Sequence, residues 1–372
     1  MATETSTHLN IKCPNCGSPE VVFHAGNQAL TCSHCGYEKQ LPKETHEIVE
    51  QPLGASFHLE DAQTGLEIVT KAYHCNGCGA DVAVEADQVN FACPFCGSEN
   101  VNESALDTRI IRPAGVMPFK VEKSTALDAF KHWLGQGWFR PGDLAKKAQV
   151  DKLKGVYLPF WTFDAHTSSQ WRADAGYYYY VQESYTDSDG NRQTRQVRKV
   201  RWEPAAGRHS EFFDDVMVIA SQGVSQDMME DILPFNIKDV VNYDSRYLLG
   251  WETELYQKDL KEGFGVADDI MDQAIRAACS RAVPGDTQRN LRVKTQKTGL
   301  TFKHLLLPVW VAGYTYKGKI YQFIVNGQNG QVAGKKPWSA IKIALAVLAA
   351  AAVAAAIWYF SEMQGNGPIV FE

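Results

Sequence analysis

The hydrophobic and polar positions of the chain change pattern along its length, and the clearest pattern lies near the C-terminus. Ile343 to Phe360 forms an apolar run without a charged residue, glycine or proline. At a rise of ~1.5 Å per residue this run reaches about 27 Å, close to the thickness of a hydrocarbon core. The alternative, an alanine-rich soluble helix, would need a polar face, which the run lacks. We therefore predict a transmembrane helix within 338–361.

Two upstream stretches show the period of amphipathic helices. Residues 124–134 predict a helix with Ser124 as its N-cap. The residues expected on its buried face are Leu127, Phe130 and Leu134. Residues 258–283 give the stronger pattern, which Pro284-Gly285 should end. Its expected buried stripe is Leu260, Phe264, Ala267, Met271, Ala274 and Ala278. We interpret Cys279, on the same helix, as a core residue rather than a nucleophile.

Alternating patterns predict strands around these helices. Residues 176–202 indicate a hairpin with its turn at Asp189-Gly190. Residues 305–332 indicate a β-meander, with turns expected at Lys317-Gly318 and Asn329-Gly330. Together these elements predict an α+β domain with an antiparallel sheet over 105–337.

Two segments of this domain resemble each other. Residues 156–165 and 306–315 both place Leu-Pro, an apolar residue and then tryptophan in a β-stretch. We expect a pair of core strands. The alternative is that Trp161 and Trp310 line a shared binding cleft.

Composition and charge divide the chain into two parts. The 372 residues are enough for about two or three domains. Residues 1–104 contain four lysines, no arginine and fourteen acidic residues, a net charge of −10, whereas the remainder carries +4. The N-terminal residues have no apolar core typical of a secretory signal peptide. We therefore expect the cysteines to lie in a reducing compartment, as metal ligands rather than as disulfides.

Eight of the nine cysteines form four Cys-x2-Cys pairs, each followed by glycine. The pairs are separated by 15 residues in the first half and by 14 in the second. Two quartets of thiolates at this spacing predict two tetrahedral zinc sites, with iron in a rubredoxin-like site as the alternative. The expected ligands are Cys13, Cys16, Cys32, Cys35 and Cys75, Cys78, Cys93, Cys96. His34 and His74, next to ligands, are interpreted as loop residues.

A closed four-thiolate site is structural and holds no activated water. The fold class we expect is therefore multidomain, with two small zinc ribbons, an α+β domain and a C-terminal transmembrane helix. The expected boundaries are ribbon 1 at 1–45, a linker at 46–70, ribbon 2 at 71–104, the α+β domain at 105–337, the helix at 338–361 and a short extracytoplasmic tail at 362–372.

Charge bears on the partner that the ribbons would contact. Nucleic-acid binding requires lysine and arginine to displace counterions, and the ribbon region is acidic. A protein-interaction role is favoured, and nucleic acid is an unlikely partner. The hairpin at 176–202 places arginines opposite tyrosines. This pattern has three interpretations: contact with RNA or a membrane, a solvent-exposed strand edge protected by its charges, or docking on the acidic ribbons. No helicase, nucleotide-binding, protease or hydrolase motif is present, so we do not expect an enzyme.

The Cys-x2-Cys knuckles, as we call each pair with its following glycine, include "CPNCG" and "CPFCG", which resemble TFIIB-type zinc ribbons and those of the primosomal protein N′ (PriA). The helicase motor of that protein has no counterpart in this sequence. The order of ribbons, "YLPFWTFDA", the meander and the terminal span is similar to bacterial membrane-anchored double zinc-ribbon proteins of the YdjG type. That resemblance implies SPFH/flotillin-like or PspA-like protein partners in envelope stress.

These observations predict a membrane-anchored zinc-ribbon adaptor or scaffold at the cytoplasmic face of the cell (inner) membrane. Lysines lie before the span and none follows it, which predicts cytoplasmic N-terminal domains. The alternative is a membrane-tethered nucleic-acid-binding or transcription-related factor.

Overall fold

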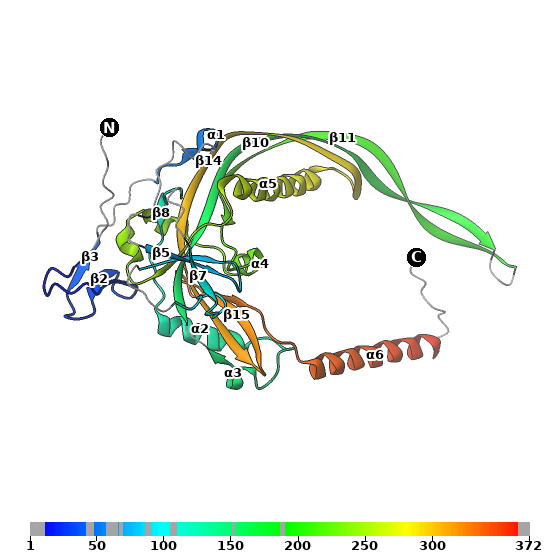
Figure 1. Ribbon diagram of the computed structural model, residues 1–372. Coiled ribbons are helices and arrows are strands. Elements are labelled where there is room, and N and C mark those ends of the chain that lie inside the picture. Colours follow the sequence, from blue (N-terminus) through cyan, green and yellow to red (C-terminus); the bar gives the residue numbers. More distant parts are fainter. Residues whose placement is uncertain are drawn as a thin grey trace.

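The structure, a computed structural model, describes residues 12–41, 48–56, 66, 70–85, 91–104, 110–150, 153–186 and 190–363. A 13-stranded sheet forms the body, and a separate three-stranded sheet carries the first cysteine quartet. Figure 1 shows the small sheet at one end and a lone C-terminal helix projecting from the other side. The predicted fold class of two zinc ribbons, a largely antiparallel sheet domain and one C-terminal apolar helix is confirmed.

Three long strands set the shape of the body: β10 (Lys154–Thr186), β11 (Arg192–Ile219) and β14 (Thr287–Tyr316). β10 pairs antiparallel with both of the others. The strands arch over α5 (Leu260–Ala282), which lies on their concave side (Figure 1). The pairing of β10 with β14 stops at Gly176, and residues 177–186 and 192–201 continue as a two-stranded projection that we call the arm. The predicted hairpin is thus present, and it is longer than the sequence pattern indicates.

The predicted meander is confirmed. β14 turns into β15 (Lys319–Asn326) through Lys317 and Gly318, both with positive φ, and β15 continues to β16 (Val332–Gly334). The two similar segments pair antiparallel, as expected for core strands, with Leu158 opposite Leu307. Their tryptophans do not share a cleft, because Trp161 and Trp310 belong to different clusters of buried side chains.

Two helix predictions need correction. α2 (Lys123–Gly135) has Glu122 at its N-cap and no side-chain cap bond, so Ser124 lies within the helix. α5 begins with a capping box of Asp259 and Glu262. Its fully buried positions are Leu260, Gly263, Ala267, Met271, Ile275 and Cys279. Phe264, Ala274 and Ala278 were also expected on this stripe but are only half-buried, because from Gly263 the buried stripe advances in steps of four and winds round the helix along the arched sheet.

Short elements complete the body. Their bounds are β4 (Gln51–Pro52), α1 (Leu53–Ser56), β8 (Gly115–Val116), α3 (Leu144–Lys147), β9 (Gln149–Val150), α4 (Gln226–Glu230), η2 (Ile237–Asp239), β12 (Val241–Asn242), η3 (Ser245–Leu248) and β13 (Glu252–Glu254). β4 pairs with β14, and Leu53 is buried against the body. Residues 48–56 of the segment interpreted as a linker are therefore packed on the sheet, because Leu53 has apolar surface to bury.

The C-terminal helix α6 (Ala340–Met363) contains the candidate span Ala340–Phe360, whose 18-residue apolar window has a mean hydropathy of 2.4 and no buried residue. Within the part of the chain that the structure describes, it is the one helix long and apolar enough to cross a membrane. The expected tail after it falls mostly on residues 364–372, which lie outside the described residues.

Candidate metal centres

The first centre lies on the three-stranded sheet of β1 (Val21–His24), β2 (Ala29–Cys32) and β3 (Glu38–Gln40). One Cys-x2-Cys turn precedes β1 and the other joins β2 to β3. The four Sγ atoms of Cys13, Cys16, Cys32 and Cys35 lie within 4.8 Å of one another. The structure thus brings the first predicted quartet together.

The second centre belongs to the main sheet. Its strands are β5 (Thr70–Cys75), β6 (Asp81–Glu85) and β7 (Val101–Ser104). The four Sγ atoms of Cys75, Cys78, Cys93 and Cys96 also lie within 4.8 Å of one another. β6 pairs with β13 of the body, so this ribbon continues the 13-stranded sheet.

The spacing of the sulfur atoms fits zinc. Zn–S bonds of about 2.3 Å in a tetrahedron place the sulfurs about 3.8 Å apart. The Sγ atoms of Cys13 and Cys35 are 3.6 Å apart, and those of Cys16 and Cys32 are 3.7 Å apart. In the second centre both close pairs are at 3.5 Å. Four thiolates leave no open coordination position, so both are sites for structural zinc ions.

The turns around the sulfurs explain the glycine after each pair. Gly17 donates its N–H to the carbonyl of Cys13 at 2.8 Å, with a φ of 73° that favours glycine. The other three turns repeat this positive φ. The Asn15 side chain donates to the sulfur of Cys35 at 3.6 Å and is the main cause that lowers the pKa of that thiol to about 6.

Ribbon 1 is attached to the body through β1, the strand that follows its first Cys-x2-Cys turn. The N–H of Phe23 donates to the carbonyl of Leu249, and the indole of Trp251 donates to the carbonyl of Phe23, both at 2.9 Å. The ring of Phe23, 1% exposed, meets Tyr247 edge-on at 4.9 Å. Ribbon 1 is therefore held against η3 and residues 249–251, which lead from η3 to β13.

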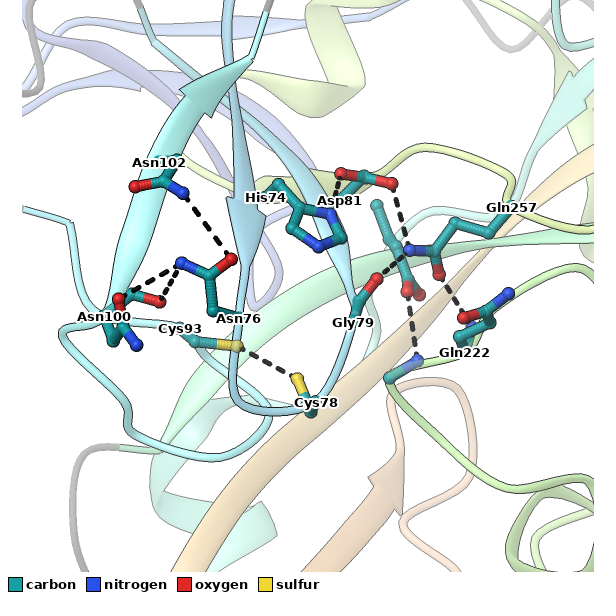
Figure 2. Close-up of polar contacts among 12 residues, drawn as sticks. His74, Asn76, Cys78, Gly79, Asp81, Cys93, Asn100, Asn102, Gln222 and Gln257 are labelled. Atoms are coloured by element: carbon teal, nitrogen blue, oxygen red, sulfur yellow. Dashed lines mark hydrogen bonds and ion pairs between the residues drawn. The ribbon is translucent and has the colours of Figure 1, made fainter.

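Ribbon 2 is joined to the body by backbone and side chains together. Figure 2 shows Gln257 pointing into the ribbon, where its amide donates to the carbonyl of Gly79 and, at 3.1 Å, to Asp81. His74 lies on strand β5 rather than in the predicted loop, and its Nδ1 is hydrogen-bonded to the Asp81 carboxylate at 2.8 Å. The N–H of Leu255 donates to the carbonyl of Asp81. A knuckle of the second centre therefore rests directly on the chain that precedes α5.

Other predicted residues lie apart from the centres. Cys279 is fully buried on α5, which confirms it as a core residue. His34 lies in a turn of ribbon 1. The arm extends away from ribbon 1 (Figure 1), so the alternative that its basic residues dock on that ribbon within one chain is wrong. Its arginines instead lie over tyrosines of the arm, with Arg198 4.3 Å from the ring centroid of Tyr178.

A buried charge cluster escaped the sequence reasoning. Lys303, 8% exposed, places its ammonium 2.8 Å from Asp215, 3.1 Å from Glu50 and 3.9 Å from Asp164. Burial raises the pKa of Asp164 to about 6. The cluster includes a possible metal-binding group of Asp164, Asp214 and Asp215, but the ammonium already serves as its cation. We interpret it as the contact that holds the segment after ribbon 1 to the sheet.

Comparison with known proteins agrees with this arrangement. The family model of ribosomal protein S27 matches residues 4–43, the region of the first ribbon. The uncharacterized protein YdjG of Bacillus subtilis (strain 168) is 28% identical over 350 residues, which cover 90% of this chain and 92% of that protein. No solved structure matches. The predicted resemblance to proteins of the YdjG type is confirmed along nearly the whole chain.

Proposed function

We propose that this chain is a membrane-anchored zinc-ribbon scaffold that recruits protein partners at the cytoplasmic face of the cell membrane. The observation that carries the proposal is the placement of ribbon 1 and α6 on opposite sides of one body (Figure 1). An exposed apolar helix anchors best in lipid, and closed thiolate centres hold the shape of a surface rather than perform chemistry. The ribbon would thereby be presented away from the membrane.

The orientation follows from charge and redox chemistry. Lys335, Lys336 and Lys342 lie just before or at the start of the apolar window of α6. Basic residues next to a span tend to stay in the cytoplasm. Zinc thiolates also persist where cysteines are kept reduced. Both arguments put the body in the cytoplasm.

A protein partner fits the ribbon surfaces better than nucleic acid does. Glu20, Glu38, Glu99 and Glu103 are exposed there, and each Zn(Cys)4 centre formally adds two negative charges. Phosphates would be repelled. SPFH/flotillin-like or PspA-like partners, implied by the resemblance to YdjG-type proteins, belong to this proposal. We propose no catalytic role.

A second candidate is nucleic-acid binding. The match of ribbon 1 to ribosomal protein S27 and the basic, tyrosine-rich arm favour it. Here the arm, not the acidic ribbons, would contact the phosphates.

Affinity capture with the detergent-solubilised full chain separates the two. Cys16→Ser, which removes a ligand of ribbon 1, should abolish capture of a defined protein partner. Tyr180→Ser, an exposed change on the arm, should leave it intact. Capture that survives Cys16→Ser, or nucleic acid whose retention is lost in Tyr180→Ser, would refute the scaffold proposal.

A further inference from the structure

Exposed aromatic side chains gather where α6 leaves the body. Trp138 and Phe139, in the loop between α2 and α3, are 81% and 40% exposed. Trp338 and Ile341, at the start of α6, are 73% and 75% exposed. Phe139 and Trp338 stack at 6.2 Å with an interplanar angle of 19°. Apolar side chains gathered this openly on a surface mark a contact with a partner or with lipid.

Hydrogen bonds tie this loop to the first turn of α6. The N–H of Ser339 donates to the carbonyl of Phe139 at 2.7 Å, and the ammonium of Lys342 donates to the carbonyl of Trp138 at 3.2 Å. Trp138 is thus a direct neighbour of Lys342, in the first turn of the apolar helix. Because the loop and the first turn of α6 are hydrogen-bonded to each other, both lie at the same depth in any bilayer that α6 enters.

The same place carries positive charge. Lys336 donates to the carbonyl of Trp133 at 2.6 Å and to that of Gln136 at 3.2 Å. Arg140 lies in the loop itself and donates to the carbonyl of Gly135. Tryptophan with lysine and arginine is the combination that favours the headgroup region of a membrane whose surface is anionic.

We infer that residues 136–142 and 336–342 form an interfacial platform that inserts into the headgroup region of the leaflet entered by α6. This inference rests on the proposed membrane anchoring. It commits to an anionic lipid surface because the platform continues from the first turn of α6 and carries three cations. The platform makes a second membrane contact and fixes one face of the body toward the bilayer.

The test uses the full chain in vesicles of phosphatidylcholine and phosphatidylglycerol whose acyl chains are brominated close to the headgroups, where bromine quenches nearby tryptophan. Of nine tryptophans, three should be quenched: Trp138, Trp338 and Trp358. Trp138→Phe keeps an aromatic ring and should remove about one third of the quenchable emission, because it deletes one of these three interface positions. Trp202→Phe, at the base of the arm, is the matched control and should leave the quenching unchanged.

Flotation of the same samples separates two kinds of failure. If the chain floats with the vesicles and Trp138→Phe quenches like the unaltered protein, the platform is refuted and the anchor stands. If the chain does not float with the vesicles, the membrane anchoring fails and the platform fails with it. Loss of the quenching that depends on Trp138 when phosphatidylglycerol is omitted would further support recognition of the anionic surface.

Discussion

The two zinc centres should differ in how much of the protein depends on them. Cys16 and Cys78 hold equivalent positions, each the second cysteine of the first knuckle. Serine at either position replaces a thiolate by a poor zinc ligand and should reduce the zinc content from two ions per chain to one. The consequences for the body should be unequal, because ribbon 1 forms its own sheet and ribbon 2 belongs to the main one.

The magnitude follows from the side chains that ribbon 2 buries. Phe95, Val82 and Val84 are at most 2% exposed. Burial of each contributes about 1.5–3 kcal/mol, so release of ribbon 2 should cost about 5–9 kcal/mol. That is a large share of a typical domain stability of about 5–15 kcal/mol. Among the described residues of ribbon 1, Phe23 is the largest buried side chain, and it packs on the body. Loss of its burial should cost about 1.5–3 kcal/mol of the body's stability.

Zinc analysis and thermal unfolding of the full chain in detergent test this. At about 2–4 °C per kcal/mol, Cys78→Ser should lower the Tm of the body by more than about 10 °C. Cys16→Ser should lower it by less than half as much. Equal shifts for the two variants would refute the integration of ribbon 2 into the sheet. Retention of two zinc ions in Cys78→Ser would refute the assignment of its ligands.

Three further predictions concern pH, nucleic acid and topology. Burial raises the pKa of Glu254 from 4.5 to about 8, so the stability of the fold should fall as the pH rises from about 4.5 to about 8. Glu254→Gln lacks this loss and should be the more stable protein at pH 9 in thermal unfolding; an equal pH dependence of both proteins would contradict this. The full chain should bind nucleic acid no more tightly than about 10⁻⁶ M near physiological salt, and a tighter Kd in a filter-binding titration would disprove that. Protease added to intact spheroplasts should spare everything before the C-terminal tail, whereas loss of the ribbons would reverse the topology.

The sequence predicts those parts of the molecule whose causes are local. Each cysteine quartet is closed by two short turns, so spacing and the following glycine are sufficient to recognise it. The Lys317-Gly318 turn and the apolar run of α6 are local in the same sense. Each of these needs no information about distant residues.

The arched strands and the charge cluster depend on partners far away in the sequence. β11 runs through Pro204, which would normally end a strand, because β11 pairs with β10 alone and lies at an edge of the sheet. Glu50 and Lys303 meet across 253 positions, and neither belongs to a recognisable pattern. For the same reason the sequence predicts ribbon 2 as an independent module, although β13 joins it to the main sheet.

The arm places a physical condition on how α6 enters a membrane. Figure 1 shows the arm and α6 extending from the body toward the same side, so a bilayer crossed at right angles by α6 in this orientation would also contain part of the arm. The arm carries Arg195, Arg198 and Lys199, and one such charge at the bilayer centre costs about 2.5–3.5 kcal/mol or more. The backbone groups at its strand edges would also lack partners in lipid. The arm must therefore remain in water.

Insertion then requires α6 to take a different angle to the sheet, while the place at which it leaves the body, on the side away from ribbon 1, stays the same. Residues 335–339 have no regular structure and include Pro337, so they are the place for this change. The loop 136–142 is also irregular, and its bonds to Ser339 and Lys342 hold it beside the first turn of the helix. Trypsin added to vesicles that display the body outward should cut the arm after its basic residues without detergent. An arm that becomes accessible only in detergent, in vesicles without any partner protein, would mean that the arm lies in the bilayer and would refute the change of angle.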